Sequence, residues 1–320
     1  MTKIFLARHA TALTVTATFC LAAPAAHAEI AYVPNEGDGT ISLIDTTTDT
    51  VTGSIKAGDK PRGMIASPDK QKIYVSDQPN NRLMIIDVPG KKVMDEIDLG
   101  ESPEGVGGSP DGKLVAAAIE EDNAVYFIDA TTHEKLFEIE TEGENPEHPV
   151  FSPDGKWVYV SAEESQVVDV IDVTNRRHHT SIQVGKRPRG IGFTPDGKTA
   201  YVACEVASMV YAIDVAEHKV IAKIEGGKRS NGVRMNPNGK EVYVSNGAES
   251  SVMVIDTATN KEISRIEVGD RPWNMGITSD GKKLYVANGR SGTVSVIDTE
   301  SKKKIKDIEV GKLPWGVLVP

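Results

Sequence analysis

Short runs of β-branched and aromatic residues follow one another along most of the chain, and polar turns separate them. Between residues 190 and 225 the runs are GIGFT, TAYVA, MVYAID and VIAKIE. Their brevity, their even spacing and the residue types in them predict strands, and no stretch has a helical pattern. The sequence therefore predicts a succession of short antiparallel strands.

An Ile-Asp pair returns along the chain at steps of 42 or 43 residues. Its aspartates are Asp45, Asp87, Asp129, Asp172, Asp214, Asp256 and Asp298. Thirteen residues before six of them lies a tyrosine, whereas the third copy has Ala116. A fixed period of this length indicates a repeat architecture. We expect each of these aspartates to accept amide hydrogen bonds in the turn that follows it, which is a structural role.

A turn of the type SPDGK lies between the first two strands of most repeats, and Gly is suited to its left-handed position. The first copy, SPDKQ, has Lys70 there. Four strands repeated seven times predict an all-β seven-bladed β-propeller of four-stranded antiparallel blades. The chain enters the first blade at its second strand, and GKLPWGVLVP stops after a first strand. We therefore expect the C-terminal strand to close the first blade.

Residues 1–28 differ from the rest of the chain. Lys3 and Arg8 precede a short apolar run without acidic residues, and Ala26-His27-Ala28 is typical of a cleavage site. This pattern predicts a signal peptide over residues 1–28, a mature propeller over residues 29–320, and a periplasmic or secreted location. No later segment predicts membrane insertion.

The chain left after cleavage would have 34 basic and 46 acidic residues, a net charge of −12. This acidic balance argues against nucleic acid as a partner. Only Cys204 remains after residue 28, so no internal disulfide is expected, and we expect it to be a buried thiol. We expect a monomer.

The YVSN-type tetrapeptides, the VID sequences and the SPDGK turns resemble the YVTN family of seven-bladed propellers over residues 29–320. The ending VGKLPWGVLV and the segment GDRPWN are similar to a periplasmic subgroup associated with alcohol catabolism that depends on pyrroloquinoline quinone (PQQ). The resemblance implies an accessory role, with PQQ as a possible ligand. It also implies that the loop entering each innermost strand reaches the mouth of the central channel.

These loops have nearly constant Pro and Gly positions, so the residues that vary are the candidates for ligand binding. The candidates are Arg62, Glu104, Glu147, His148, Arg189, Asn231, Trp273, Asn274 and Trp315. Guanidiniums, an amide and two indoles around a concave mouth suit a small planar anionic ligand. The alternative is structural: Arg62 and Arg189 pair with Glu104 and Glu147, and the indoles only pack on neighbouring loops.

The sequence contains no established catalytic or metal motif, and we expect no catalytic residues and no metal site. The leading hypothesis is a non-catalytic exported propeller that binds a ligand or a partner protein through its mouth. A second is an enzyme of the lactonase or lyase type that uses His148 and Glu147 as an acid–base pair. A third is a structural scaffold for protein–protein contacts.

Overall fold

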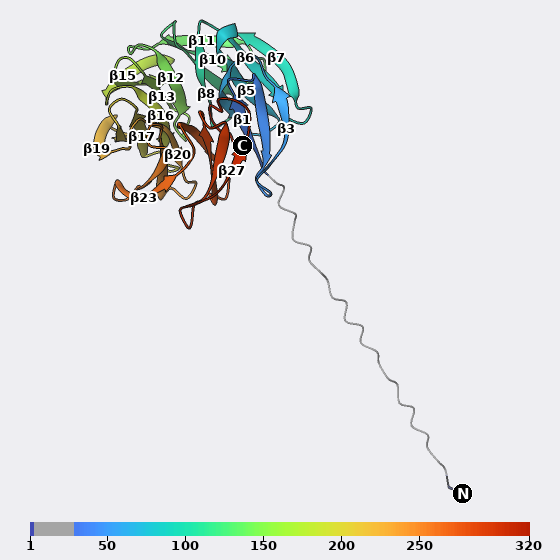
Figure 1. The fold of residues 1–320 in the computed structure, drawn as a ribbon. Helices are drawn as coiled ribbons and strands as arrows, with labels where there is room; N and C mark the ends of the chain where they lie inside the picture. Colours follow the sequence, from blue (N-terminus) through green and yellow to red (C-terminus); the bar gives the residue numbers. More distant parts are fainter. Residues whose placement is uncertain (3–28) are drawn as a thin grey trace.

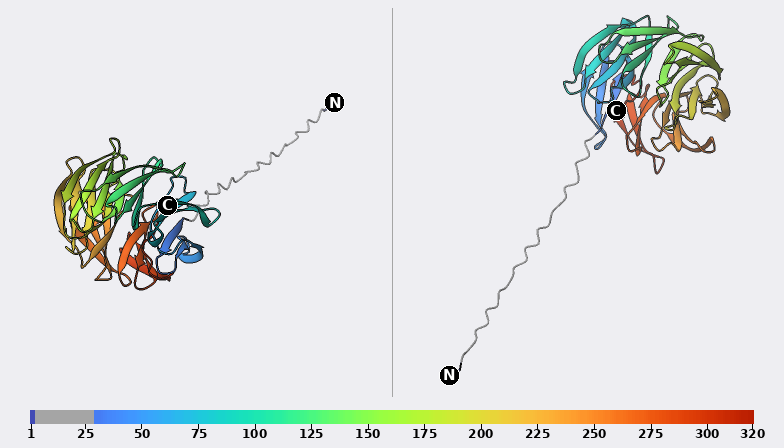
Figure 2. Two further views of the ribbon diagram at one scale, coloured as in Figure 1. Left: turned by 90° about the horizontal axis from the view of Figure 1, so that it is seen from above. Right: turned by 180° about the vertical axis from the view of Figure 1, so that it is seen from behind.

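Seven small antiparallel sheets surround a central axis in the computed structural model of the chain (Figure 1). The structure describes residues 1–2 and 29–320, so nearly all of the expected signal peptide lies outside the described residues. Within the described part of the chain, no helix is long and apolar enough to cross a membrane. Figure 2 shows the same ring of blades from above and from behind. The predicted all-β seven-bladed propeller is confirmed.

Each blade runs outward from the axis in chain order. Blade 1 contains β1 (Ile30–Asn35), β2 (Thr40–Asp45) and β3 (Thr50–Lys56). The next three blades are formed by β4 (Pro61–Ala66), β5 (Lys72–Asp77), β6 (Arg82–Asp87) and β7 (Lys92–Asp98); β8 (Pro103–Gly108), β9 (Leu114–Ile119), β10 (Ala124–Asp129) and β11 (Lys135–Glu140); and β12 (Pro146–Phe151), β13 (Trp157–Ala162), β14 (Val167–Asp172) and β15 (Arg177–Gln183). A 3-10 turn, η1 (Gln78–Asn80), follows β5.

The last three blades have the same order of strands. They are formed by β16 (Pro188–Phe193), β17 (Thr199–Cys204), β18 (Met209–Asp214) and β19 (Lys219–Glu225); β20 (Ser230–Met235), β21 (Glu241–Asn246), β22 (Ser251–Asp256) and β23 (Lys261–Glu267); and β24 (Pro272–Ile277), β25 (Lys283–Asn288), β26 (Thr293–Asp298) and β27 (Lys303–Glu309). Blades 2 to 7 are four-stranded sheets, and β1, β2 and β3 form a three-stranded one.

The recurring turns have the geometry that the sequence predicts. In the SPDGK turn of blade 3, Gly112 has φ 70°, and the Asp111 carboxylate accepts the Lys113 amide at 3.1 Å. Lys70 occupies the equivalent position with φ 59°, a conformation that costs a side-chain-bearing residue about 1 kcal/mol. The recurring aspartates accept amides two or three residues on, as Asp129 does from Thr131 at 2.7 Å. Their structural role is confirmed.

The repeated tyrosines are buried between blades and connect several neighbouring blades through their hydroxyls. Tyr74 of blade 2 donates to the Ala130 carbonyl of blade 3 at 2.8 Å, and Tyr201 of blade 5 donates to Asn260 of blade 6 at 2.6 Å. A phenol is long enough to cross the apolar layer between two sheets and still satisfy its polar end, which explains its repetition. Ala116 of blade 3 has no hydroxyl and makes no such bond.

The segment after residue 312 completes blade 1. Tyr32 and Leu318 exchange backbone hydrogen bonds of 2.8 and 2.9 Å, and the Trp315 amide donates to the Pro34 carbonyl at 2.9 Å. Leu318 packs in the apolar layer between blades 1 and 2, while Val317 and Val319 pack between blades 7 and 1. The expected closure of the ring by the C-terminal strand is confirmed.

The closing segment makes a testable contribution to stability. Leu318→Ala removes buried side-chain atoms at the closure, so we expect it to lower the free energy of unfolding by about 2–5 kcal/mol. Leu136→Ala is the matched control, because Leu136 is 44% exposed on β11 and should change stability by no more than about 0.5 kcal/mol. Urea denaturation of the two variants measures the difference. Equal midpoints would mean that Leu318 is not part of the closed ring.

Candidate functional site

All nine candidate residues line one cavity at the mouth of the channel. The cavity has a volume of about 230 Å³, and its other lining residues are Glu36 and Leu313. The candidates stand at the start of the innermost strands of blades 2 to 7 and in the closing segment of blade 1. The sequence analysis therefore selected residues that meet in space, although it did not include Glu36 and Leu313.

The constant glycines allow the innermost strands to approach one another. A Cβ on Gly63 would lie 2.6 Å from the Glu104 carbonyl oxygen, and one on Gly232 would lie 2.4 Å from the Trp273 carbonyl oxygen. Both distances are too short for any side chain, so the backbone of each blade contacts the next at this level. The residue before each glycine, such as Arg62 or Asn231, is thereby held at the rim of the cavity.

Arg62 and Arg189 are both paired with buried carboxylates. Arg62 contacts Glu104 of the neighbouring blade and lies 3.0 Å from the Glu36 carboxylate. Arg189 contacts Glu147 of the neighbouring blade and Glu163. The pairing that the sequence left open is therefore present, and these two guanidiniums do not project unopposed into the mouth.

A denser cluster surrounds Glu205, which is only 1% exposed. Its carboxylate lies 2.7 Å from Arg271, 3.1 Å from Arg229, 3.4 Å from Arg187 and 3.6 Å from Arg189. Burial alone would raise the pKa of Glu205, but the surrounding guanidiniums outweigh it and hold this pKa below its ordinary value. Glu205 thus stays ionised at the centre of four cations.

The sequence analysis missed this cluster, although the repeat contains a pattern that identifies it. Four residues after the tyrosine position stand Glu36, Gln78, Glu120, Glu163, Glu205, Gly247 and Gly289. Directly before the mouth proline or serine stand Lys60, Ser102, Asn145, Arg187, Arg229, Arg271 and Leu313. Of the residues at these loop positions, Glu36 contacts Arg62, and Glu163 and Glu205 contact Arg189.

The acidic side of the mouth contains carboxyls that burial holds partly protonated. Burial raises the pKa of Glu104 to about 7, and the attraction of Arg62 does not offset it. Burial likewise raises the pKa of Glu163 to about 7. The nearby Glu120 carboxylate adds to both shifts. Near pH 7 the mouth therefore has fewer negative charges than its carboxyl groups suggest.

His148 stacks on Trp315, with ring centroids 5.5 Å apart and planes inclined by 12°. Its Nδ1 lies 3.1 Å from the Glu147 carboxylate, but not in hydrogen-bond geometry. Burial lowers the pKa of His148 to about 4, so the imidazole is neutral at pH 7. Neither ring nitrogen has a hydrogen-bond partner among the described residues.

Unsatisfied polar atoms concentrate at the mouth. Among residues 29–320, nine buried side-chain nitrogen or oxygen atoms have no hydrogen-bond partner in the protein, and eight of them belong to residues at the mouth. They belong to Arg62, Glu147, His148, Arg187, Arg189, Glu205 and Asn231. Folded proteins pair nearly all such groups with protein, water or ligand. This concentration distinguishes the mouth from the rest of the molecule.

The remaining reactive side chains lie away from the mouth cavity. Cys204 is fully buried, as expected, and burial raises the pKa of its thiol to about 12. His178 belongs to β15 and contacts Asp169 at 3.0 Å. Within the described part of the chain, no group of three His, Cys, Asp or Glu residues is arranged to hold a metal ion.

Two family models match parts of the chain. Residues 172–310 match the model described as "Lactonase, 7-bladed beta-propeller", and residues 116–206 match "Cytochrome D1 heme domain". Each match covers less than half of the chain. Glu147 and His148 fall within the second matched segment and outside the first. Neither model is that of the YVTN family or of a PQQ-associated subgroup, so that resemblance stays a prediction.

Three solved structures of other proteins have the same fold. Hydrazine synthase from Kuenenia stuttgartiensis is 23% identical with a TM-score of 0.73, covering 80% of this chain and 88% of that one. A functionally unknown protein from Desulfotomaculum acetoxidans DSM 771 is 16% identical with a TM-score of 0.81, covering 91% and 98%. The dihydro-heme d1 dehydrogenase NirN, solved in complex with DHE, is 16% identical with a TM-score of 0.70, covering 91% and 75%. At these identities the similarity shows the fold alone.

Among curated proteins, the PE-PGRS family protein PE_PGRS18 of Mycobacterium tuberculosis (strain ATCC 25618 / H37Rv) is 54% identical over 37 residues. The match covers 12% of this chain and only 8% of that protein. A match of this length corresponds to less than one repeat and gives no information about the mouth.

The raised pKa of Glu104 makes stability depend on pH. Its ordinary pKa is 4.5 and its folded pKa is about 7, so the folded state binds more protons between these values. The stabilisation from this group is complete below pH 4.5 and is lost as the pH rises through 7. Glu104→Gln cannot ionise, so its free energy of unfolding relative to wild type should rise by about 1–3 kcal/mol from pH 5 to pH 8.

Urea denaturation at the two pH values measures this change. Glu121→Gln, at an exposed position after the second strand of the same blade, is the control for the loss of one surface carboxylate. If the difference between Glu104→Gln and wild type were the same at both pH values, Glu104 would have no raised pKa.

Proposed function

We propose that this chain is an exported, non-catalytic propeller that binds a small planar anionic ligand in its mouth cavity. The observation that carries the proposal is the concentration of unsatisfied buried polar atoms around one cavity that residues from every blade line. A ligand with hydrogen-bonding groups would satisfy the donors of Arg189, His148 and Asn231. The signal peptide expected over residues 1–28 supports a periplasmic or secreted location.

The charge distribution supports an anion on the side of blades 5 to 7. Arg187, Arg189, Arg229 and Arg271 all face Glu205. Arg229 and Arg271 have no other acidic partner among the described residues, so their charges are only partly offset. A carboxylate or phosphate would complete this cluster through forked hydrogen bonds.

The aromatic groups and the volume of the cavity support a small planar ligand. Trp315 and His148 already stack on each other, and Trp273 packs over Gly289, where a Cβ would lie 2.7 Å from the indole. A cavity of about 230 Å³ is smaller than the pockets of about 300–1,000 Å³ that enclose drug-sized ligands. The largest ligand that the cavity can enclose therefore has two or three fused rings.

The comparisons also support a planar ligand, because one model is that of a heme domain and NirN is named for heme d1. A tetrapyrrole macrocycle, however, exceeds a cavity of about 230 Å³, so we do not assign a heme to the mouth. PQQ has three fused rings and three carboxylates. It suits the aromatic groups and the arginine cluster, although Glu104 and Glu147 would repel its additional charges.

A titration with PQQ tests the proposal, with the tryptophan fluorescence of the protein as the readout. We expect saturable binding that Arg271→Gln and Arg189→Ala each weaken at least tenfold, because each removes a charge-assisted hydrogen bond from the anion. Arg62→Ala, on the acidic side of the mouth, should have a smaller effect.

Arg177→Gln is the control, because Arg177 is exposed on the outermost strand β15. Circular dichroism of each variant verifies that the fold is retained. Absence of saturable binding, or equal affinities in all four variants, would contradict the proposal for PQQ.

An enzyme of the lactonase type is the second candidate. It is favoured by the partial match to the lactonase model and by the neutral His148 beside Glu147, a pair able to act as a base and its orienting carboxylate. Against it, both residues lie outside the matched segment 172–310.

Hydrolysis of a δ-lactone distinguishes the two candidates. As a binding protein, the chain should not increase the rate above that in buffer alone between pH 5 and pH 8. A catalysed rate that His148→Ala abolishes, with the fold retained, would replace the binding proposal. A base of pKa about 4 would also give a rate that is constant above about pH 5 and falls below pH 4.

A further inference from the structure

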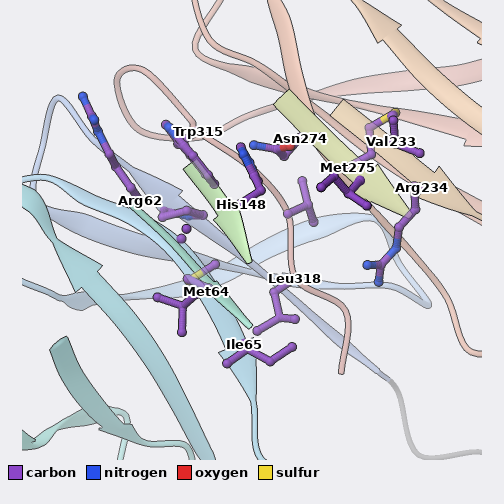
Figure 3. A pocket seen from close by; sticks show the side chains of 18 residues that line it. Arg62, Met64, Ile65, His148, Val233, Arg234, Asn274, Met275, Trp315 and Leu318 are labelled. Carbon is purple, nitrogen blue, oxygen red and sulfur yellow. The ribbon is translucent and has the colours of Figure 1, made fainter. Parts of the chain in front are cut away.

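Below the mouth the central channel continues as a cavity of about 150 Å³, which shares Arg62, His148, Asn274 and Trp315 with the mouth cavity and is apolar in its lower part. Its lining includes Met64, Ile65, Ile191, Met275 and Leu318. In Figure 3 the mouth residues Arg62, Trp315, His148 and Asn274 lie along the upper part of the view, and Met64, Ile65 and Leu318 lie below them. The character of the channel thus changes from polar to apolar within one strand length.

Arg234 on β20 interrupts this apolar lining. In Figure 3 its guanidinium lies on the lower, apolar side of the cavity. It makes no hydrogen bond or ion pair with any residue of the described chain, in contrast to the arginines of the mouth. Desolvation alone lowers its pKa, and no carboxylate contributes to the shift. An arginine nevertheless stays charged in a protein.

The position is occupied differently in every other blade. The residues equivalent to Arg234 are Ile65, Gly107, Val150, Gly192, Gly276 and Leu318. Six copies of the repeat therefore have an apolar residue or glycine at this level, and one has a cation. Nothing in the construction of the blade requires this arginine, because the other six blades form without it.

The two neighbouring blades have glycine at the position equivalent to Arg234. Gly192 on β16 and Gly276 on β24 flank it, and both lack side chains at the level of the guanidinium. A Cβ on Gly192 would lie 3.1 Å from Val233 and 3.5 Å from Met235 of the same strand as Arg234. The absence of a side chain at Gly192 therefore makes room for Val233 and Met235, the neighbours of Arg234 on β20.

The channel also opens from the face opposite the mouth. A second cavity, of about 420 Å³, shares Ile191, Val233 and Arg234 with the first. Its outer residues include Pro153, Pro237 and Ser279, which belong to the turns at the other end of the innermost strands. Arg234 thus stands where the two cavities meet, accessible without passing the ion pairs of the mouth.

We propose that Arg234 is the anchor of a second binding site, which takes a small amphipathic monocarboxylate. The carboxylate would pair with the guanidinium in a forked geometry, and the apolar body would occupy the cavity between Met64, Met275 and Leu318. An isolated cation in an apolar environment is costly unless an anion or water satisfies it. A cavity of about 150 Å³ has room for a benzene-sized group beside the apolar side chains of Met64, Met275 and Leu318.

Benzoate is the probe, and benzyl alcohol is its neutral counterpart of similar shape. We expect the full-length chain to bind benzoate in calorimetric titration at least tenfold more tightly than benzyl alcohol. Arg234→Met should weaken benzoate at least tenfold and leave benzyl alcohol within twofold, because it removes the charge and retains the length of the side chain. Arg177→Met is the matched control on the surface and should leave both affinities unchanged.

Arg234→Met is expected to fold and to melt at a higher temperature, because it replaces an unpaired cation by an apolar group. Arg234→Gln provides a second neutral variant with a polar end. Benzoate that does not bind the wild type, or that binds Arg234→Met as tightly, would overturn the proposal. Loss of benzoate binding in Arg271→Gln but not in Arg234→Met would move the site to the mouth and also overturn it.

The two proposals fail separately. Titration of Arg234→Met with PQQ reports on the mouth, and titration of the wild type with benzoate reports on the channel. The two cavities share Arg62, His148, Asn274 and Trp315, but Arg234 lines only the channel cavity and contacts none of the mouth ion pairs, so its substitution tests the channel site alone.

Discussion

The innermost strands of seven blades converge on one axis, and their backbones contact one another where the mouth glycines stand. A Cβ at Gly63 or Gly232 would overlap the carbonyl of the next blade, so these two positions require glycine, whereas blades 4 and 7 have His148 and Asn274 at the equivalent position. The preceding residue is fixed at the rim as a consequence. The geometry of the mouth therefore follows from the packing of the ring, while its chemistry is free to differ from blade to blade.

The charged side chains are distributed unevenly around the rim. Carboxyls dominate on the side of blades 3 and 4, where burial holds Glu104 and Glu163 partly protonated. Guanidiniums dominate on the side of blades 5 to 7, where four of them surround Glu205. The mouth therefore has an acidic side and a basic side, and its buried charges are offset by several partners together. Because burying a charge has a solvation cost, each ion pair contributes less to stability than its short distance suggests.

The fold could be predicted because the residues that form the turns and strands recur from repeat to repeat along the sequence. A single turn such as SPDGK is weak evidence, but its recurrence in register with a tyrosine and an aspartate excludes other folds, and exceptions such as Lys70 and Ala116 do not obscure it. The nine mouth candidates could be selected for the same reason. Their contacts could not be predicted, because Glu163 and Glu205, which pair with Arg189, and Arg271, which pairs with Glu205, come from two other sets of loops. Arg234 was missed because a single arginine within a strand has no unusual sequence pattern until its six counterparts are compared.

The hydrogen bonds between Tyr32 and Leu318 join segments from the two ends of the propeller. Pairing across so long a stretch of chain has a high entropic cost and forms late in folding. Without this pairing the molecule would be an open crescent whose strand β1 and closing segment both present unpaired amides. Two such crescents can exchange closing segments, and the product is a domain-swapped dimer. The yield of correctly closed rings is accordingly set by protein concentration while folding is under way, and dilution favours the single-chain ring.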